Sequence, residues 1–152
     1  MEGITDQQVA EILNSSIGTE EWETRLGQEI DDALVGAVNH FDFNASEFGR
    51  QMWKGFNLDL HAYFCKDGKP REWLTDVITG DVRNLVVSIT SAITAKYDVT
   101  IAIAIPITAL MLKTGILNYC ANKSEQNSDK LFNTYKGLLA RHSKKKKRRK
   151  KK

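Results

Sequence analysis

A histidine and a cysteine stand four residues apart, and they are the first candidates for chemistry. Asn57, His61 and Cys65 recur every four residues, so a helix would place them on one face. Imidazole and thiolate both bind zinc, but a zinc site takes three or four ligands. The other histidines, His40 and His142, lie outside this segment. We therefore expect no metal site, and a half-buried histidine beside a core cysteine instead.

The same pair has the composition of a nucleophile and its base. Lys66 follows Cys65 directly, and a neighbouring cation lowers the pKa of a thiol. A Cys–His nucleophile is usually oriented by a third group, and no candidate for it is evident. The glycines likewise show no phosphate-binding spacing. We predict no catalytic residue, no cofactor and no small-molecule substrate, and therefore a chain that is not an enzyme.

The two cysteines, Cys65 and Cys120, form no C-x-x-C pair. The first residues of the chain lack the basic and apolar regions of a secretory signal. We therefore expect reduced, buried thiols and a cytoplasmic location. The alternatives are membrane association, or the nucleus if the source is eukaryotic or viral.

Charge is distributed very unevenly along the chain. The last nine residues, which we call the basic run, are all Lys or Arg. The 22 basic side chains include these nine, so 13 remain among residues 1–143 to face 19 acidic ones. The protein is therefore an acidic body with a basic appendage. The basic run consists of Lys144, Lys145, Lys146, Lys147, Arg148, Arg149, Lys150, Lys151 and Lys152.

The basic run is predicted to be disordered, because it has no apolar surface to bury and its charges repel one another. Its physical competence is contact with a polyanion, either nucleic acid, an anionic lipid surface or an acidic partner. No aromatic residue is interleaved within it, so a base-stacking role is not supported. A nuclear-import signal and a solubilising or engineered tail are the remaining interpretations. Lys136 and Arg141, just ahead of the run, are expected to extend the contact.

Residues 85–120 hold most of the continuous hydrophobicity, and they are either core or membrane. The longest uncharged stretch, Val99 to Leu112, has 14 residues, whereas a membrane span needs about 20. We therefore favour a central apolar helical hairpin, with membrane insertion as the alternative. The apolar residues that carry this hairpin are Leu85, Val86, Ile89, Ile93, Ile101, Ile103, Ile105 and Leu110.

Apolar residues recur every three or four positions along most of the chain, which predicts helices. Thr5, Thr19 and Asn44 are the expected N-caps. The face from Phe48 to Phe64, with Tyr63 included, is expected to be buried. The alternation from Val99 to Ile105 is strand-like, but a single strand would have no partner, so a buried helix kinked at or started by Pro106 is preferred. The predicted helices cover roughly residues 5–14, 19–41, 45–64, 73–77, 82–97, 99–121 and 131–139.

Four glycines fall inside predicted helices, where each costs about 0.5–1 kcal/mol relative to alanine. Close approach of two helices would account for that cost at Gly27, Gly36, Gly49 and Gly55. The three tryptophans are expected to pack at the edge of the core, although one could be a binding anchor.

The sequence thus predicts an all-α protein, a compact bundle of about five to seven helices. Residues 1–142 are expected to form one domain, and residues 143–152 a disordered Lys/Arg tail. The predicted function is that of a non-enzymatic adaptor or accessory protein that contacts a polyanion through the tail. Its helical body is expected to meet a protein partner or a second copy of the chain. The alternative is a membrane-active protein that inserts residues 85–120 and lays the tail on anionic lipid.

Overall fold

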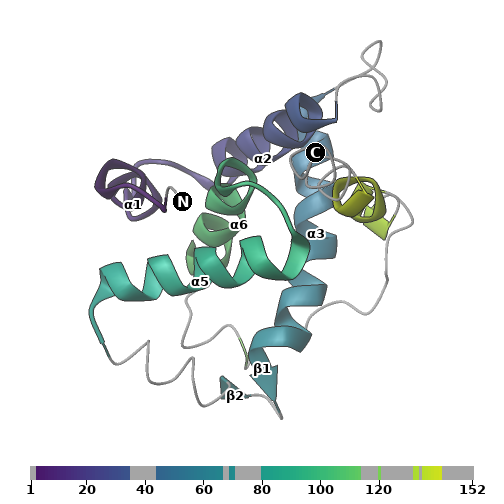
Figure 1. Cartoon of the computed structure of the whole chain (residues 1–152). Helices are drawn as coiled ribbons and strands as arrows, with labels where there is room; N and C mark the ends of the chain where they lie inside the picture. Colours follow the sequence, from purple (N-terminus) through teal and green to yellow (C-terminus); the bar gives the residue numbers. More distant parts are fainter. Residues whose placement is uncertain are drawn as a thin grey trace, which may run out of the picture.

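The protein is all-α, as the sequence predicts. The computed structural model describes residues 3–34, 44–66, 69–70, 80–113, 120, 132–133 and 135–141 (Figure 1). The helices are α1 (Asp6–Ile12), α2 (Thr19–Ala33), α3 (Ala45–Phe64), α5 (Val82–Tyr97) and α6 (Ile101–Lys113). Further helical residues at 132–133 and 135–141 are called the C-terminal helix. A small antiparallel pair, β1 (Cys65–Lys66) and β2 (Lys69–Pro70), follows α3.

Two of the three predicted N-caps are confirmed. Thr5 forms a reciprocal capping box with Gln8 at the start of α1. Asn44 accepts a hydrogen bond from the backbone N–H of Glu47 at the start of α3. The prediction for Thr19 is wrong by one residue, because Gly18 is the cap and Thr19 is already helical. Gly18 offers no side chain to cap the helix. The acidic residues in the first turn of α2 stabilise this end instead, because they lie at the positive end of the helix dipole.

Helices α2 and α3 touch backbone to backbone. A methyl group on Gly27 would overlap the carbonyl oxygen of Ala45, and one on Gly49 would overlap the carbonyl oxygen of Glu23. The predicted close approach of helices is therefore confirmed at these two positions, and the two helices in contact are α2 and α3.

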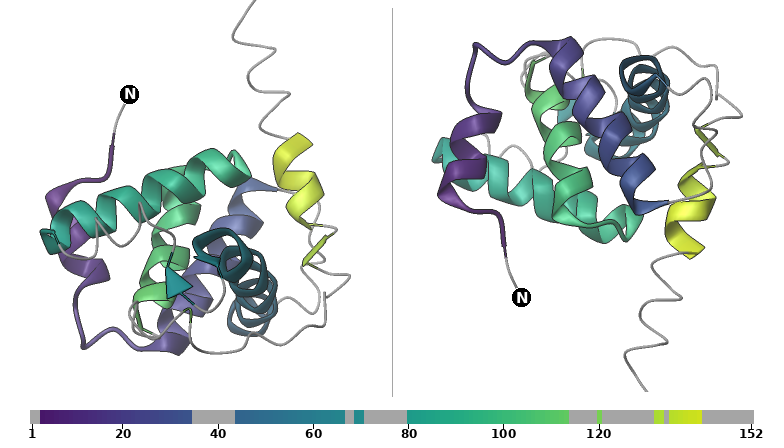
Figure 2. Two further views of the ribbon diagram at one scale, coloured as in Figure 1. Left: turned by 90° about the horizontal axis from the view of Figure 1, so that it is seen from below. Right: turned by 90° about the horizontal axis from the view of Figure 1, so that it is seen from above.

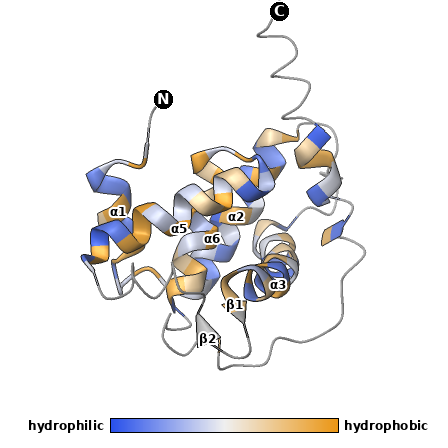
Figure 3. Ribbon diagram, turned by 60° about the horizontal axis from the view of Figure 1, so that its bottom comes forward, coloured by the Kyte–Doolittle hydropathy of each residue, from blue (hydrophilic) through white to orange (hydrophobic). Residues whose placement is uncertain are grey.

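Helix α6 is the centre of the fold and packs against α1, α2, α3 and α5. In Figure 2 α3 is seen nearly end-on, whereas α5 runs across the view. Figure 3 shows α1, at the periphery, with both hydrophilic and hydrophobic residues along its length. Its buried residues are Val9 and Ile12.

The apolar hairpin lies in the core. Seven of its eight predicted residues are buried. The eighth, Ile101, is partly buried and packs against the same core. Between α5 and α6 the hydroxyl oxygens of Thr90 and Thr108 lie 3.0 Å apart, and Thr108 donates to the carbonyl oxygen of Ala104 at 3.0 Å. This satisfies two polar groups that would otherwise be costly to bury. Within the described residues, no helix combines the length and the hydrophobicity that a membrane crossing requires.

Proline does not begin α6. The helix starts at Ile101, and Pro106 lies inside it. Proline at this position cannot donate to the carbonyl of Ala102, four residues earlier. Ala102 is exposed, so water can take the place of the missing donor. One lost hydrogen bond near the helix start is offset by burial of Pro106 itself and of its neighbours.

Several predicted segments lie outside the described residues. These are the extension of α2 to Phe41, the short helix at residues 73–77, the end of the hairpin beyond Lys113 except Cys120, and the basic run.

The glycine contact gives a direct test of the fold. Gly27→Ala and Gly49→Ala should each lower the free energy of unfolding by about 1–3 kcal/mol or more, because the added methyl meets backbone that cannot move aside. Gly137→Ala is the matched control, since a methyl there meets only ordinary contacts. That variant should gain about 0.5–1 kcal/mol from helix propensity. Urea unfolding followed by circular dichroism measures all three, and equal effects at the three sites would contradict the close approach.

Candidate functional site

The basic run follows a helix that is firmly packed on the body. Phe132 is buried against Gly55, where even a methyl group would overlap its ring. Its ring centroid lies 4.9 Å from that of Phe56, in an edge-to-face arrangement. The ring of Tyr135 lies 4.9 Å from that of Phe48. The C-terminal helix is therefore held along α3 by aromatic contacts.

Asp59 joins three elements through one carboxylate oxygen. Lys136 Nζ donates to Asp59 Oδ2 at 2.7 Å, and the Tyr97 hydroxyl donates to the same oxygen at 3.3 Å. Lys136 also lies over the rings of Tyr97 and Phe132. Its side chain is 42% exposed. The sequence predicts that Lys136 extends the polyanion contact, and that stays a prediction. In the structure its ammonium pairs with Asp59 and so links the C-terminal helix to α3.

Arg141 differs from Lys136. It is exposed at the last described helical position, and its Nε donates to the Gly137 carbonyl of its own helix at 3.4 Å. Its charge therefore stands beside the start of the basic run.

A second lysine lies against an exposed aromatic ring. Lys96 Nζ is 4.9 Å from the ring centre of Tyr63 and 5.3 Å from that of Tyr97. Tyr63 is 36% exposed, so its predicted burial with the rest of the α3 face is wrong. The neighbouring Phe64 is fully buried instead. Adjacent helical positions point about 100° apart, and at the end of α3 the core lies on the side of Phe64.

The histidine and cysteine do not form the site that the sequence left under consideration. Cys65 is bonded to Cys120, so the expectation of reduced thiols is wrong. A disulfide sulfur is neither a thiolate ligand nor a nucleophile. His61 is half-buried on α3, as expected. Within the described part of the chain, no three His, Cys, Asp or Glu side chains gather as a metal ion would require.

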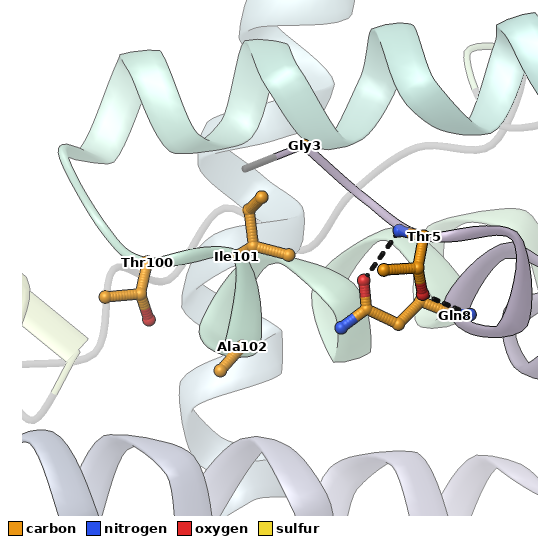
Figure 4. A pocket seen from close by; sticks show the side chains of 6 residues that line it. All are labelled: Gly3, Thr5, Gln8, Thr100, Ile101 and Ala102. Carbon is orange, nitrogen blue, oxygen red and sulfur yellow. Dashed lines mark hydrogen bonds between the residues drawn. The ribbon is translucent and has the colours of Figure 1, made fainter. Parts of the chain in front are cut away.

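A cavity near the start of the chain was not predicted from the sequence. It measures about 710 Å³ and is lined by residues of the N-terminal segment and of the start of α6 (Figure 4). Thr5 and Gln8 bond to each other there, since Gln8 N donates to Thr5 Oγ1 at 3.1 Å and Thr5 N donates to Gln8 Oε1 at 2.9 Å. These groups cap α1, and we assign the hollow no ligand.

Burial and neighbouring groups shift the pKa values of acidic residues on α2 and α3. Burial raises the pKa of Glu23, and Arg50 opposes that shift in part. Burial also raises the pKa of Glu29, with the negative charge of Asp32 adding to the effect. On α3, a hydrogen bond from Arg50 lowers the pKa of Glu47. The body thus carries closely spaced carboxylates on α2.

The two tryptophans within the described residues are core residues rather than binding anchors. Trp22 is fully buried and Trp53 is nearly so. Trp73 lies outside the described residues.

Comparison with known proteins identifies no relative: no family model, curated protein or solved structure matches this chain.

The disulfide is testable by thiol counting. Protein purified and denatured without reductant should show no thiol that reacts with Ellman's reagent. Cys120→Ser should lower the free energy of unfolding by about 4 kcal/mol, because the cross-link closes a loop of 55 residues. Cys65→Ser combined with Cys120→Ser should match the single variant, since one cross-link is lost in both. Two reactive thiols in the unreduced protein would contradict the pairing.

The shift at Glu29 predicts a pH dependence. Its pKa in the folded protein lies above 4.5, so the folded state holds this proton more tightly than the unfolded chain does. The free energy of unfolding should therefore fall as the pH rises from about 4.5 through the folded pKa. Glu29→Gln removes this contribution. Urea midpoints of both proteins between pH 4 and pH 7 should diverge with rising pH, with the variant the more stable. A constant difference would count against the shift.

Proposed function

We propose that this chain is a non-enzymatic helical adaptor or accessory protein that binds a polyanion through residues 144–152. The observation that carries the proposal is the run of nine consecutive Lys and Arg residues behind an acidic body. Nine contacts to duplex DNA would give an affinity that falls with salt at a slope of about −0.9 per neutralised phosphate. Such a run binds through charge and reads no sequence.

The packing of the C-terminal helix supports a tethering role. Phe132, Tyr135 and Lys136 fix that helix to α3. The 11 residues from 142 to 152 can reach at most about 40 Å from it when fully extended. A polyanion held by the run would therefore stay close to the body. The body is the part that would meet a protein partner or a second copy.

Membrane insertion is the weaker proposal. Burial of the α5–α6 hairpin beneath α1, α2 and α3 supports its role as core. A lipid surface then enters only as one of the polyanions that the basic run could contact.

The cytoplasmic location stays a proposal, and the disulfide weighs against it. Disulfides persist in oxidising compartments and are rare where glutathione keeps thiols reduced. Thiol counting on protein that is alkylated inside its own compartment decides between a reducing location, such as the cytoplasm, and an oxidising one.

Deletion of residues 144–152 tests the proposed function. The truncated protein should elute from immobilised heparin and from duplex DNA at much lower salt than the full chain, with an unchanged helical circular dichroism spectrum. The matched control exchanges every Lys in the run for Arg and every Arg for Lys. Because this keeps the charge, it should keep the retention. Unaltered retention after deletion would sink the proposal.

A further inference from the structure

The exposed ring of Tyr63 and the ammonium of Lys96 form a small aromatic and basic surface. We propose that this surface binds single-stranded nucleic acid, with one base stacked on Tyr63 and Lys96 on the neighbouring phosphate. This inference rests on the proposed function and names the polyanion. The basic run would supply the remaining phosphate contacts.

The composition of the surface fits this ligand. Proteins that bind single strands without sequence preference combine cations along the backbone with aromatic side chains on which bases stack. Tyr63 lies in the last turn of α3 and Lys96 in the last turn of α5, so two packed helices hold the ring and the charge together. The ring is 36% exposed, and Lys96 is exposed as well.

Lys96 can leave the ring at small cost. An exposed cation–π contact is a weak interaction, whereas a phosphate is a full negative charge that also accepts hydrogen bonds. We therefore infer an exchange in which Lys96 covers Tyr63 in the free protein and moves to a phosphate in the complex. A base then takes the place of the ammonium on the ring.

The surface also lies near the C-terminal helix, which precedes the basic run in the sequence. Tyr97, beside Lys96, hydrogen-bonds Asp59, which in turn holds Lys136 of the C-terminal helix. Figure 2 shows that helix near the end of α5. One strand could therefore contact Tyr63, Lys96 and the basic run together, since the run reaches up to about 40 Å.

A lipid surface fits less well. An aromatic side chain that enters a bilayer interface is most effective among apolar neighbours. The ammonium of Lys96 lies 4.9 Å from the centre of the Tyr63 ring, and the exposed side chain next to Tyr63 in the sequence is the small Ala62. A polar-tipped ring next to an ammonium instead matches a base next to a phosphate.

Binding of the full-length chain to a 20-nucleotide oligo-dT strand, a duplex of equal length and heparin tests the inference. Tyr63→Ala should weaken binding to oligo-dT by about 5- to 10-fold, the low end of what one stacked base contributes. Binding to the duplex and to heparin should change by less than about twofold, because a duplex hides its base faces and heparin has none. Tyr63→Phe keeps the ring and should restore binding to oligo-dT. Leu13→Ala, which truncates another large exposed apolar side chain, is the matched control and should change none of the three.

The outcomes separate the two proposals. Equal loss of all three ligands in Tyr63→Ala, or no loss of oligo-dT, overturns the stacking role while the basic run keeps its function. Unaltered binding of every ligand after deletion of residues 144–152 overturns the proposed function instead. Binding to vesicles of phosphatidylserine and phosphatidylcholine that is tighter than to oligo-dT, and also weakened by Tyr63→Ala, would overturn nucleic acid in favour of lipid. Lys96→Gln should lower the salt slope on oligo-dT by about 0.7, the value of one single-strand phosphate contact.

Discussion

The contact between α2 and α3 at Gly27 and Gly49 constrains the rest of the structure. Backbone touches backbone there, so the distance between the two helices is fixed by atoms that have no rotamers to adjust. Trp22, Leu26 and Ile30 of α2 are fully buried at this spacing, and α6 packs on both helices. The conformational entropy that two helical glycines lose on folding is offset by this packing. A wider separation would open space that the same side chains could not fill.

A second glycine gives α3 a different partner. Gly49 and Gly55 are six residues apart, which places them about 120° from each other around the helix. Gly49 therefore receives α2, while Gly55 receives the ring of Phe132. Helix α3 thus has two glycines at which a neighbour packs closely. One contacts α2 of the body, and the other contacts Phe132 of the segment that leads to the basic run. The ion pair between Asp59 and Lys136 adds a polar fastening one turn beyond Gly55.

The features that could be predicted from the sequence are those determined by residues close together along the chain. The caps at Thr5 and Asn44, the extent of α5 and the burial of the hairpin follow from side chains within a few residues of each other. Partners distant in sequence could not be found in this way. Lys136 and Asp59 are 77 positions apart, and only the fold brings them together. The disulfide is a similar case, because the two cysteines carry no spacing motif. Tyr63 and Phe64 were ambiguous for another reason: either ring continues the helical stripe, and the choice depends on what packs opposite.

Electrostatics suggests different roles for the basic run and for the folded surface at Tyr63 and Lys96 in the proposed binding. A run of nine like charges binds any polyanion and distinguishes poorly among them, because charge carries no shape. At low salt the carboxylates of α2 would compete with an external partner for such a run. Any selectivity must therefore come from folded surface that the ligand touches after capture. The surface at Tyr63 and Lys96 is built on helix ends fixed by the core, so its geometry does not depend on the conformation of the run. Capture and recognition would then reside in separate parts of the chain, joined by the C-terminal helix.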